Sequence, residues 1–285
     1  MSESDNLRTL RNMLEEGRRA LEVADIDTAR LDAEVLLVHA GGVSRAMLRA
    51  GSARIDTEII RKFRRMVARR AAREPLAYIV GRKEFFSLDF EVTPAVLIPR
   101  PETETLVECA LKFIEPRSEP HVLDIGTGSG AISVAIAMNA FDSRIIATDI
   151  SEAALEVARR NAARHRCDDR IDFVRTDLFP EGDARFDLIV SNPPYIADAE
   201  SDTLQPEIRL HEPRVATIAG NDGLEFYRRI ATGCRSHLHT DGAVMVEIGA
   251  GQASAVEALF RAAGFSNIDA VRDLAGIERI VRALQ

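Results

Sequence analysis

Apolar residues recur every three or four positions through residues 1–75, a spacing that predicts amphipathic helices. The pattern divides into a first helix near 7–21, a second over 27–40 that ends at a glycine pair, and a third over 56–73. Its apolar positions are Leu7, Leu10, Leu14 and Leu21, then Leu31, Val35 and Val38, then Ile59, Ile60, Phe63, Met66 and Val67. This part of the chain is therefore predicted to be a small helical bundle.

The period changes from helix to strand at residues 83–93. Phe86, Leu88, Phe90 and Val92 alternate with polar neighbours there, as in a half-buried β-strand. We predict a short β-hairpin at this place, followed by a proline-rich boundary and a helix over 102–113. The hairpin would link the helical bundle to the rest of the chain.

From residue 121 onward, strand-like and helix-like segments alternate, which predicts a parallel, doubly wound sheet. The last two strand-like segments, 266–273 and 277–284, are too close together for a crossover helix, so we expect them to be antiparallel. The first five strand-like segments are 121–126, 144–149, 170–175, 186–191 and 243–248. The predicted class is α/β, with seven strands and an antiparallel last pair. The predicted domains are 1–80 (helical), 81–100 (hairpin linker) and 101–285 (sheet).

Length and composition agree with this division. A chain of 285 residues is long enough for about two domains. Its 46% hydrophobic and 29% charged residues exclude a wholly disordered chain, a collagen-like chain and a disulfide scaffold. No apolar run reaches the ~18 residues of a membrane span, and the charged N-terminus has no signal-peptide core. We therefore expect a cytoplasmic protein whose three isolated cysteines are reduced.

Charge is distributed unevenly along the chain. Residues 1–83 hold 17 Lys and Arg against 12 Asp and Glu, a net of +5, and the remainder holds 20 against 33, a net of −13. Either the two parts meet different partners, or the basic residues form a solvated helical face. A generic nucleic-acid binder is more often basic throughout.

A glycine loop follows the strand at 121–126 and opens a helix. Glycine lets the backbone approach a ligand and adopt positive φ, and the helix N-terminus offers free N–H groups. Asp149 ends the next strand, where a carboxylate can bind both hydroxyls of a ribose. The loop residues are Gly126, Thr127, Gly128, Ser129 and Gly130. The pattern indicates a nucleotide-like cofactor, the alternative being a glycine turn without a ligand.

The glycines alone do not distinguish between cofactors. Gly126, Gly128 and Ala131 also satisfy the relaxed dinucleotide fingerprint, so NAD stays possible on this motif. Asp124 precedes the loop and can pair with the cationic part of a ligand, whereas it would repel a pyrophosphate.

A second motif, Asn192, Pro193, Pro194 and Tyr195, follows the strand at 186–191. Ligands of open α/β sheets bind beyond the carboxyl ends of the strands, so the motif lies where a ligand is expected to bind. The Asn192 side chain and a proline carbonyl can accept two hydrogen bonds from one planar NH2 group, and Tyr195 can stack on it. The alternative is a structural Pro-Pro turn with asparagine as a local cap.

Such an NH2 group is a poor nucleophile because its lone pair is delocalised. Two acceptors at Asn192 and Pro193 would bias the nitrogen toward tetrahedral geometry and point the lone pair at an electrophilic carbon. This chemistry needs no metal and no covalent intermediate.

The glycine loop, Asp149 and NPPY together resemble class I S-adenosylmethionine-dependent methyltransferases that act on amide or exocyclic nitrogens, which have a Rossmann-like fold. Residues 73–108, REPLAYIVGRKEFFSLDFEVTPAVLIPRPETETLVE, resemble the release factor glutamine methyltransferases of the HemK/PrmC type. The helical first domain and the ending RDLAGIERIV (272–281) do so as well. Ribosomal-protein glutamine methyltransferases share this front architecture but generally lack the PRPETE form at 99–104.

The resemblance implies roles for residues at matching positions. The residues from Gly126 to Gly130 would contact the methionine part of S-adenosylmethionine, and Asp149 would hold the ribose. Some members carry an aromatic residue where this chain has Leu178. The residues expected to flank the adenine are Thr176, Asp177, Leu178 and Phe179. Asn192 would contact cofactor and substrate, and the residues expected to contact the substrate glutamine are Pro193, Pro194 and Tyr195.

For other polar residues, the sequence gives weaker support for a functional role. Arg100 and Glu102 either shape the pocket rim or form an interdomain salt bridge. His237 and His239 lack further ligands nearby, so we expect no metal site there. Glu247, at the end of the fifth strand, is interpreted as structural rather than catalytic.

The resemblance implies N5-methylation of the glutamine in the Gly-Gly-Gln loop of peptide-chain release factors, with the basic helical domain docking the protein substrate. We expect a monomer that binds neither a membrane nor, stably, nucleic acid. The alternatives are a ribosomal-protein glutamine methyltransferase, a nucleic-acid N6-adenine methyltransferase, a non-catalytic binding module and an NAD-dependent oxidoreductase. A flipped base would need a basic channel, and the acidic second part argues against one.

Overall fold

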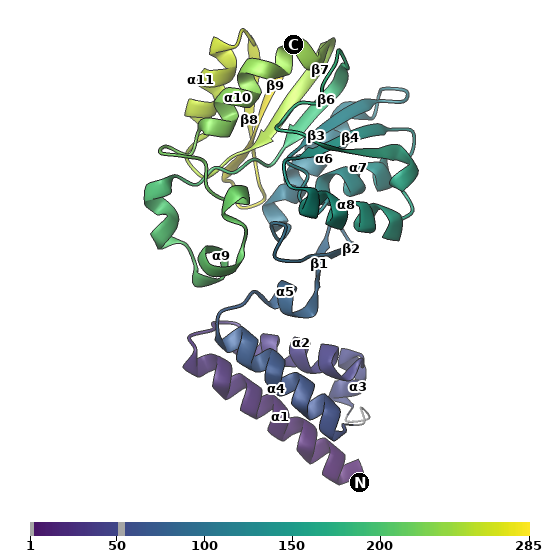
Figure 1. The fold of residues 1–285 in the computed structure, drawn as a ribbon, viewed down its shortest axis with the longest axis vertical. Helices are drawn as coiled ribbons and strands as arrows, with labels where there is room; N and C mark the ends of the chain where they lie inside the picture. Colours follow the sequence, from purple (N-terminus) through teal and green to yellow (C-terminus); the bar gives the residue numbers. More distant parts are fainter. Residues whose placement is uncertain (1–2, 51–54) are drawn as a thin grey trace. The chain divides into compact units, whose positions relative to one another are not determined.

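The computed structural model describes residues 3–50 and 55–285 (Figure 1). Its contacts group the chain into two compact units. The helical unit runs to Gly81 and includes the later segment Gln205–His211. The sheet unit consists of Arg82–Leu204 and Glu212–Gln285. The chain therefore leaves the sheet unit once and rejoins it, which the sequence pattern did not predict.

The helical unit confirms the three long helices predicted from apolar spacing. Asp56 caps the third by accepting a hydrogen bond from the Ile59 amide at 2.8 Å, and Gly42 ends the second in the left-handed conformation. Three short helices were not predicted. The helices are α1 (Glu3–Val23), α2 (Ala29–Gly41), α3 (Arg45–Arg49), α4 (Thr57–Ala71), α5 (Leu76–Val80) and α9 (Pro206–His211).

The predicted apolar stripe of α2 is wrong. Leu31 is 48% exposed, and Val35 and Val38 are only partly buried. The buried face consists of Ala29, Asp32, Ala33, Leu36, Leu37 and Ala40. Small alanines let α2 approach its neighbours closely, and the one acidic residue on this face is paired with a buried arginine. In α1, Leu10 and Leu21 are buried as expected, whereas the side chain of Leu7 lies outside those described.

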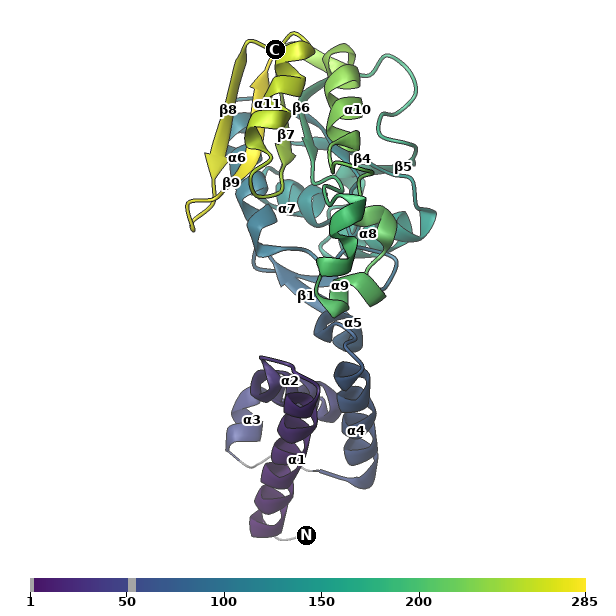
Figure 2. The ribbon, with the colours of Figure 1, turned by 90° about the vertical axis from the view of Figure 1, so that its left-hand side faces the viewer.

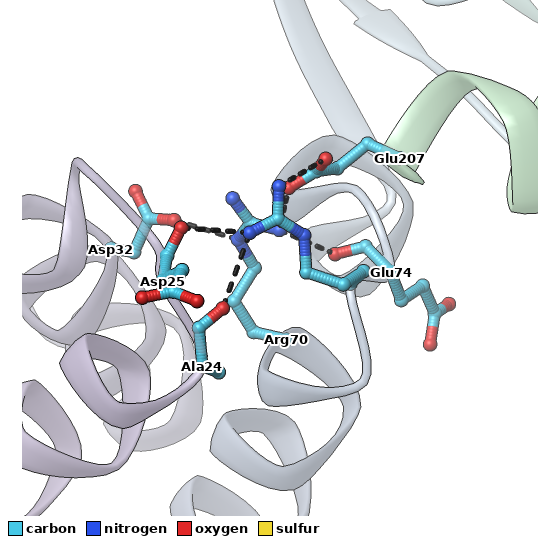
Figure 3. Close-up of polar contacts among 7 residues, drawn as sticks. Ala24, Asp25, Asp32, Arg70, Glu74 and Glu207 are labelled. Atoms are coloured by element: carbon cyan, nitrogen blue, oxygen red, sulfur yellow. Dashed lines mark hydrogen bonds and ion pairs between the residues drawn. The ribbon is translucent and has the colours of Figure 1, made fainter. Parts of the chain in front are cut away.

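A buried ion-pair cluster holds α9 within the helical unit (Figure 3). Arg70 of α4 donates to Asp32 at 2.7 Å and to Glu207 of α9 at 2.8 Å. Arg73 donates to the second oxygen of Glu207 at 2.9 Å and to the carbonyl of Asp25 at 2.8 Å. Two guanidinium groups therefore satisfy the buried carboxylate of Asp32 and the partly buried carboxylate of Glu207, which come from different helices.

The described part of the sheet unit contains a seven-stranded sheet in the order β5-β4-β3-β6-β7-β9-β8. The five strands from β3 to β7 are parallel to one another, and β9 runs antiparallel to both β7 and β8. The strands are β3 (His121–Ile125), β4 (Arg144–Asp149), β5 (Ile171–Arg175), β6 (Phe186–Ser191), β7 (Leu238–Glu247), β8 (Asn267–Arg272) and β9 (Glu278–Leu284). The predicted α/β class and mostly parallel sheet are confirmed.

Helices cover both faces of this sheet, each over its own apolar layer (Figure 2). On one face, α6 and α7 pack on β-strand residues such as Val122 and Leu188. On the other, α10 and α11 pack on residues such as Leu123 and Ile189. The helices of this unit are α6 (Glu104–Ile114), α7 (Ala131–Asn139), α8 (Glu152–Arg164), α10 (Glu225–Cys234) and α11 (Ala253–Ala262). Its short 3-10 turns are η1 (Pro101–Thr103), η2 (Asp168–Arg170), η3 (Asp198–Thr203), η4 (Arg214–Ala216) and η5 (Arg235–His237).

The predicted hairpin is present as β1 (Arg82–Phe85) and β2 (Leu88–Glu91). The predicted alternation holds at Phe90 and Val92, which are buried, but fails at Phe86. Phe86 and Ser87 form the turn, both with positive φ, so Phe85 rather than Phe86 enters the core. The Phe86 amide donates to Glu104 Oε1 at 2.8 Å, which ties this strained turn to α6. The simple period-two pattern missed the turn because no glycine or asparagine marks it.

The strand order reverses between β3 and β6. Chain connections run outward to β4 and β5 on one side and to β7 on the other, so the loops after β3 and β6 diverge from the sheet at this point. Such a switch point leaves a crevice in which ligands of open α/β sheets bind. Both motifs singled out in the sequence follow these two strands.

Candidate active site

A cavity of about 210 Å³ lies at this switch point. Its wall combines the glycine loop after β3, the end of β4, the loop after β5 and the start of the loop after β6. The predicted residues that line it are Gly126, Thr127, Gly128, Ser129, Asp149, Thr176, Asp177, Leu178, Asn192, Pro193 and Pro194. Segments far apart in the sequence thus meet in one pocket.

The glycine loop has the backbone geometry that requires glycine. Gly126, Gly128 and Gly130 have φ of 72°, 56° and 78°. A Cβ on Gly130 would stand 3.1 Å from the Cβ of Ala158, so a side chain there would also press on α8. The loop is held from the far side, because the amides of Gly126 and Thr127 both donate to the Thr148 carbonyl at 2.9 Å.

Asp149 is held in place by two backbone amides. Its Oδ2 accepts from Gly128 N and its Oδ1 from Ser151 N, each at 2.9 Å. Burial raises the pKa of this carboxyl, and hydrogen bonds from Ser151 and Gly128 oppose that shift. A carboxylate oxygen has a second lone pair, so Asp149 can still accept hydrogen bonds from a bound diol.

Asp124 lies fully buried beneath the glycine loop and does not line the cavity. Its Oδ2 accepts from the hydroxyls of Thr127 at 2.7 Å and Ser133 at 2.5 Å. Burial raises its pKa to about 6, although these hydroxyls favour the charged form. The observed contacts give Asp124 a role in holding the loop, and a pairing with the cationic part of a ligand stays a prediction.

Among the predicted adenine-flanking residues in the loop after β5, Leu178 and Phe179 lie in different environments. Leu178 lines the cavity with φ of 74°, a rare conformation for a branched side chain, and its carbonyl accepts from Thr148 Oγ1 at 2.7 Å. Phe179 does not line the cavity. Its ring stacks on His237 with centroids 4.7 Å apart, within the apolar layer under α10. The structure shows a packing role for Phe179, and its contact with a cofactor stays a prediction.

Asn192 enters the cavity wall directly after β6. Its Nδ2 donates to Thr103 Oγ1 at 3.0 Å, which leaves Oδ1 as an acceptor. The preceding Ser191 is buried and donates from Oγ to the Ile125 carbonyl at 2.8 Å, so the start of the motif is tied to the start of the glycine loop. This arrangement can present a carboxamide oxygen beside the cofactor-type loop.

Tyr195 lies behind the cavity wall rather than on it. Its carbonyl accepts from Gln252 Nε2 at 3.0 Å, and burial raises the pKa of its hydroxyl. A Cβ on Gly223 would stand 2.3 Å from the Tyr195 carbonyl oxygen, so this approach requires glycine. The predicted stacking of Tyr195 on a substrate amide is not part of the observed geometry and stays a prediction.

The PRPETE segment holds the site together from three positions. Arg100 lines the cavity and donates to Glu212 at 2.7 Å, an ion pair within the sheet unit and not between domains. Burial raises the pKa of Glu212, and Arg100 opposes the shift. Thr103 contacts Asn192, and Glu104 holds the hairpin turn. Glu102 does not line the cavity.

The sequence did not predict several of the residues that line the cavity. Phe226 and Arg229 of α10 line the cavity, and Arg229 donates to Asp177 at 2.7 Å. Pro213, Val215 and Ala216 line it from η4 and the residue before it. No motif marks Arg229 or the η4 segment. An aromatic residue one turn from an arginine on a helix was the available signal for Phe226.

Comparison with known proteins matches two families in order along the chain. Residues 12–81 match the PrmC N-terminal domain, and residues 103–210 match the methyltransferase small domain. The release factor glutamine methyltransferase of Geobacter sulfurreducens is 44% identical over 99% of this chain and 98% of its own length. That of Burkholderia pseudomallei is 46% identical over 87% of this chain and 90% of its own.

The chain belongs to the release factor glutamine methyltransferase family. Membership agrees with the resemblance found in the PRPETE segment, the glycine loop and NPPY. It also makes the chain a methyltransferase, because the larger family model covers the glycine loop and Asn192.

A solved structure supports the fold of this family member. The N-terminal domain of human METTL16 in complex with SAH aligns with a TM-score of 0.51 at 17% identity, over 70% of this chain and 76% of that one. This likeness concerns the fold alone. Within residues 3–50 and 55–285, no helix is both long and apolar enough to cross a membrane.

Proposed function

We propose that this protein transfers a methyl group to the side-chain nitrogen of a glutamine in a peptide-chain release factor, within its Gly-Gly-Gln loop. The observation that carries the proposal is the position of Asn192. Its carboxamide lies in the same cavity wall as the glycine loop and Asp149, in a chain of the release factor glutamine methyltransferase family.

The residues of the cavity fit S-adenosylmethionine. Two left-handed glycines of the wall, Gly126 and Gly128, give the ligand close access to the backbone, and Asp149 offers oriented carboxylate oxygens to a ribose diol. Leu178 and Phe226 supply apolar surface for an adenine. When bound, S-adenosylmethionine supplies an electrophilic methyl group.

The substrate amide needs orientation rather than deprotonation. Asn192 Oδ1 and the Pro193 carbonyl accept the two hydrogens of the glutamine NH2 group, which turns the nitrogen lone pair away from its own carbonyl and toward the cavity. Neither group has to gain or lose a proton before transfer, so the mechanism does not depend on a strong base. After transfer the methylated nitrogen carries a positive charge and is strongly acidic, so it loses one of its two protons through one of these hydrogen bonds to solvent and becomes a neutral N-methylamide. The apolar wall residues exclude water from the nitrogen.

The helical unit is the proposed docking site for the release factor. Residues 1–83 carry a net charge of +5, from 17 basic and 12 acidic residues, whereas the remainder is acidic. A basic surface attracts acidic patches of a protein partner without holding nucleic acid tightly. We further propose a monomer that acts in the cytoplasm, where translation takes place.

Transfer of labelled methyl to a purified release factor and to its Gln→Ala variant tests the proposal. We expect labelling of the first and none of the second. Equal labelling of both would contradict the glutamine assignment, and labelling of DNA or RNA alone would favour a nucleic-acid amino-methyltransferase.

A further inference from the structure

A buried hydroxyl lies beside the Asn192 amide, and both residues line the cavity. Thr103, the last residue of η1, is 4% exposed and accepts the hydrogen bond from Asn192 Nδ2 at 3.0 Å. The same hydroxyl faces the buried carboxyl of Glu247, the last residue of β7, and opposes the rise of the pKa of that carboxyl. Residues of three segments of the sheet unit thus come together at Asn192.

The chemistry of the chain sets the direction of each bond. A hydroxyl has one proton to donate and lone pairs that accept. Because Thr103 Oγ1 accepts from Asn192 Nδ2, its own proton is free for Glu247, whose carboxyl oxygen accepts in either protonation state. The Asn192 NH2 group can donate a proton to the Thr103 oxygen, whereas Asn192 Oδ1 has no proton to donate. The amide is held in one of its two flipped orientations.

We propose that Thr103 and Glu247 are positioning residues for methyl transfer, which act by holding Asn192 with Oδ1 available to the substrate NH2 group. This inference rests on the proposed function, because the orientation matters only if Asn192 accepts a hydrogen bond from the substrate. The reversed amide would present a second NH2 group to the glutamine NH2 group, and the two would repel.

The surroundings of Glu247 argue against a purely structural role. The side chain is 2% exposed, and its Oε2 has no hydrogen-bond partner among the described residues. A buried carboxylate with an unsatisfied oxygen weakens a fold relative to an apolar residue of similar size. The backbone here is fixed independently, since the Tyr227 hydroxyl donates to the Glu247 carbonyl at 2.9 Å. The carboxylate is therefore not needed to hold β7.

Two substitutions at Thr103 test the first step. Thr103→Val keeps the shape and removes the hydroxyl, and Thr103→Ser keeps the hydroxyl. We expect Thr103→Val to lower kcat by about 10- to 100-fold, with KM for the release factor and affinity for S-adenosylhomocysteine within about threefold of wild type. Thr103→Ser should recover most of kcat. Equal kcat values for Val and wild type would overturn the proposal.

A matched control uses an exposed threonine of the same unit. Thr232 donates to the Arg228 carbonyl on the outer face of α10, outside the cavity wall. Thr232→Val should leave kcat unchanged. A loss equal to that of Thr103→Val would show a general effect of removing a hydroxyl and would contradict the proposal.

Two substitutions at Glu247 test the second step. Both Glu247→Gln and Glu247→Leu remove the charge, but only Leu removes the acceptor for Thr103. We expect kcat to fall by about tenfold or more in Glu247→Leu and clearly less in Glu247→Gln, with thermal stability of Glu247→Leu at least equal to wild type. Equal kcat for Leu and wild type would overturn the role of Glu247.

These assays also separate the inference from the proposed function. If the wild-type protein binds S-adenosylhomocysteine but transfers no methyl to a release factor, the proposed function is wrong. The inference about Thr103 and Glu247 is then wrong as well, because it rests on that function. If the wild type transfers methyl normally and Thr103→Val is equally active, the inference alone fails.

Discussion

Ile125 and Ser191 are register partners across β3 and β6, and Ser191 Oγ also donates to the Ile125 carbonyl at 2.8 Å. These residues are the last of their strands, so Gly126 and Asn192 begin their loops at the same level of the sheet. The loop proposed to bind the cofactor and the loop proposed to bind the carboxamide are thereby placed side by side by backbone pairing. In the proposed mechanism, the fold itself brings donor and acceptor of the methyl group together.

Replacement of Asn192 should affect chemistry more than cofactor binding. In Asn192→Ala the cavity loses the side-chain acceptor for the substrate nitrogen, and we expect kcat to fall by about 10²- to 10³-fold. Affinity for S-adenosylhomocysteine, measured by calorimetric titration, should stay within about threefold. A collapse of cofactor affinity with intact single-turnover chemistry would remove Asn192 from this role.

Asp149→Ala should weaken cofactor binding more than it slows methyl transfer. Asp149 is proposed to bind the ribose and accepts hydrogen bonds from the Gly128 and Ser151 amides, so its loss removes charge-assisted hydrogen bonds worth about 1.5–3 kcal/mol each. We expect S-adenosylhomocysteine to bind at least about tenfold more weakly. Normal affinity in the same titration would show that the ribose binds elsewhere.

The stability of the protein should depend on the protonation of Glu247. Burial raises its pKa from 4.5 to about 7, Thr103 and the Arg279 and Arg100 charges oppose the shift, and Glu102 adds to it. The folded state therefore binds a proton more tightly than the unfolded chain. The stabilisation is complete below the unfolded pKa and is lost as pH rises through about 7.

Urea unfolding of wild type and Glu247→Gln from about pH 5 to about pH 8 measures this effect. The free energy of unfolding of wild type should fall relative to the variant by up to about 3 kcal/mol over this range. A constant difference between the two proteins would show that Glu247 does not titrate there. The Asp124 contribution is common to both proteins and cancels in the comparison.

Arg70 should be essential to the helical unit. Arg70→Ala leaves the carboxylates of Asp32 and Glu207 without their buried partner, and we expect a loss of about 3–5 kcal/mol. Arg61→Ala, on the same helix but in an exposed pair with Glu58, should cost less than about 1 kcal/mol. Urea unfolding followed by far-ultraviolet circular dichroism measures both. Equal losses would contradict the buried-pair account.

The sequence pattern was most informative where local signals and tertiary structure agree. Glycines with positive φ, the end of β6 and the close antiparallel pair β8–β9 were all predictable, because each depends on neighbours in the chain. The buried face of α2 was not predictable from hydrophobicity, since Asp32 is buried with a partner 38 residues away. For the same reason, the return of residues 205–211 to the helical unit left no local signal.

In the candidate site, too, residues marked by a local motif were predictable and residues brought in by packing were not. Asn192 and Asp149 were found by motif and position, whereas Thr103 and Phe226 reach the cavity region from segments that packing alone brings near. Phe179 follows a predicted pocket residue in the chain, but the apolar layer under α10 offered its ring a stacking partner in His237. Adjacent residues of an irregular loop can point into different environments, and sequence does not say which.

Tandem mass spectrometry of a release factor, after incubation with this protein and S-adenosylmethionine, tests the central claim most directly. The account predicts one added methyl group on the side-chain nitrogen of the glutamine in the Gly-Gly-Gln loop, absent when Asn192→Ala replaces the wild type. An unmodified glutamine, or a methyl group on another residue, would contradict it.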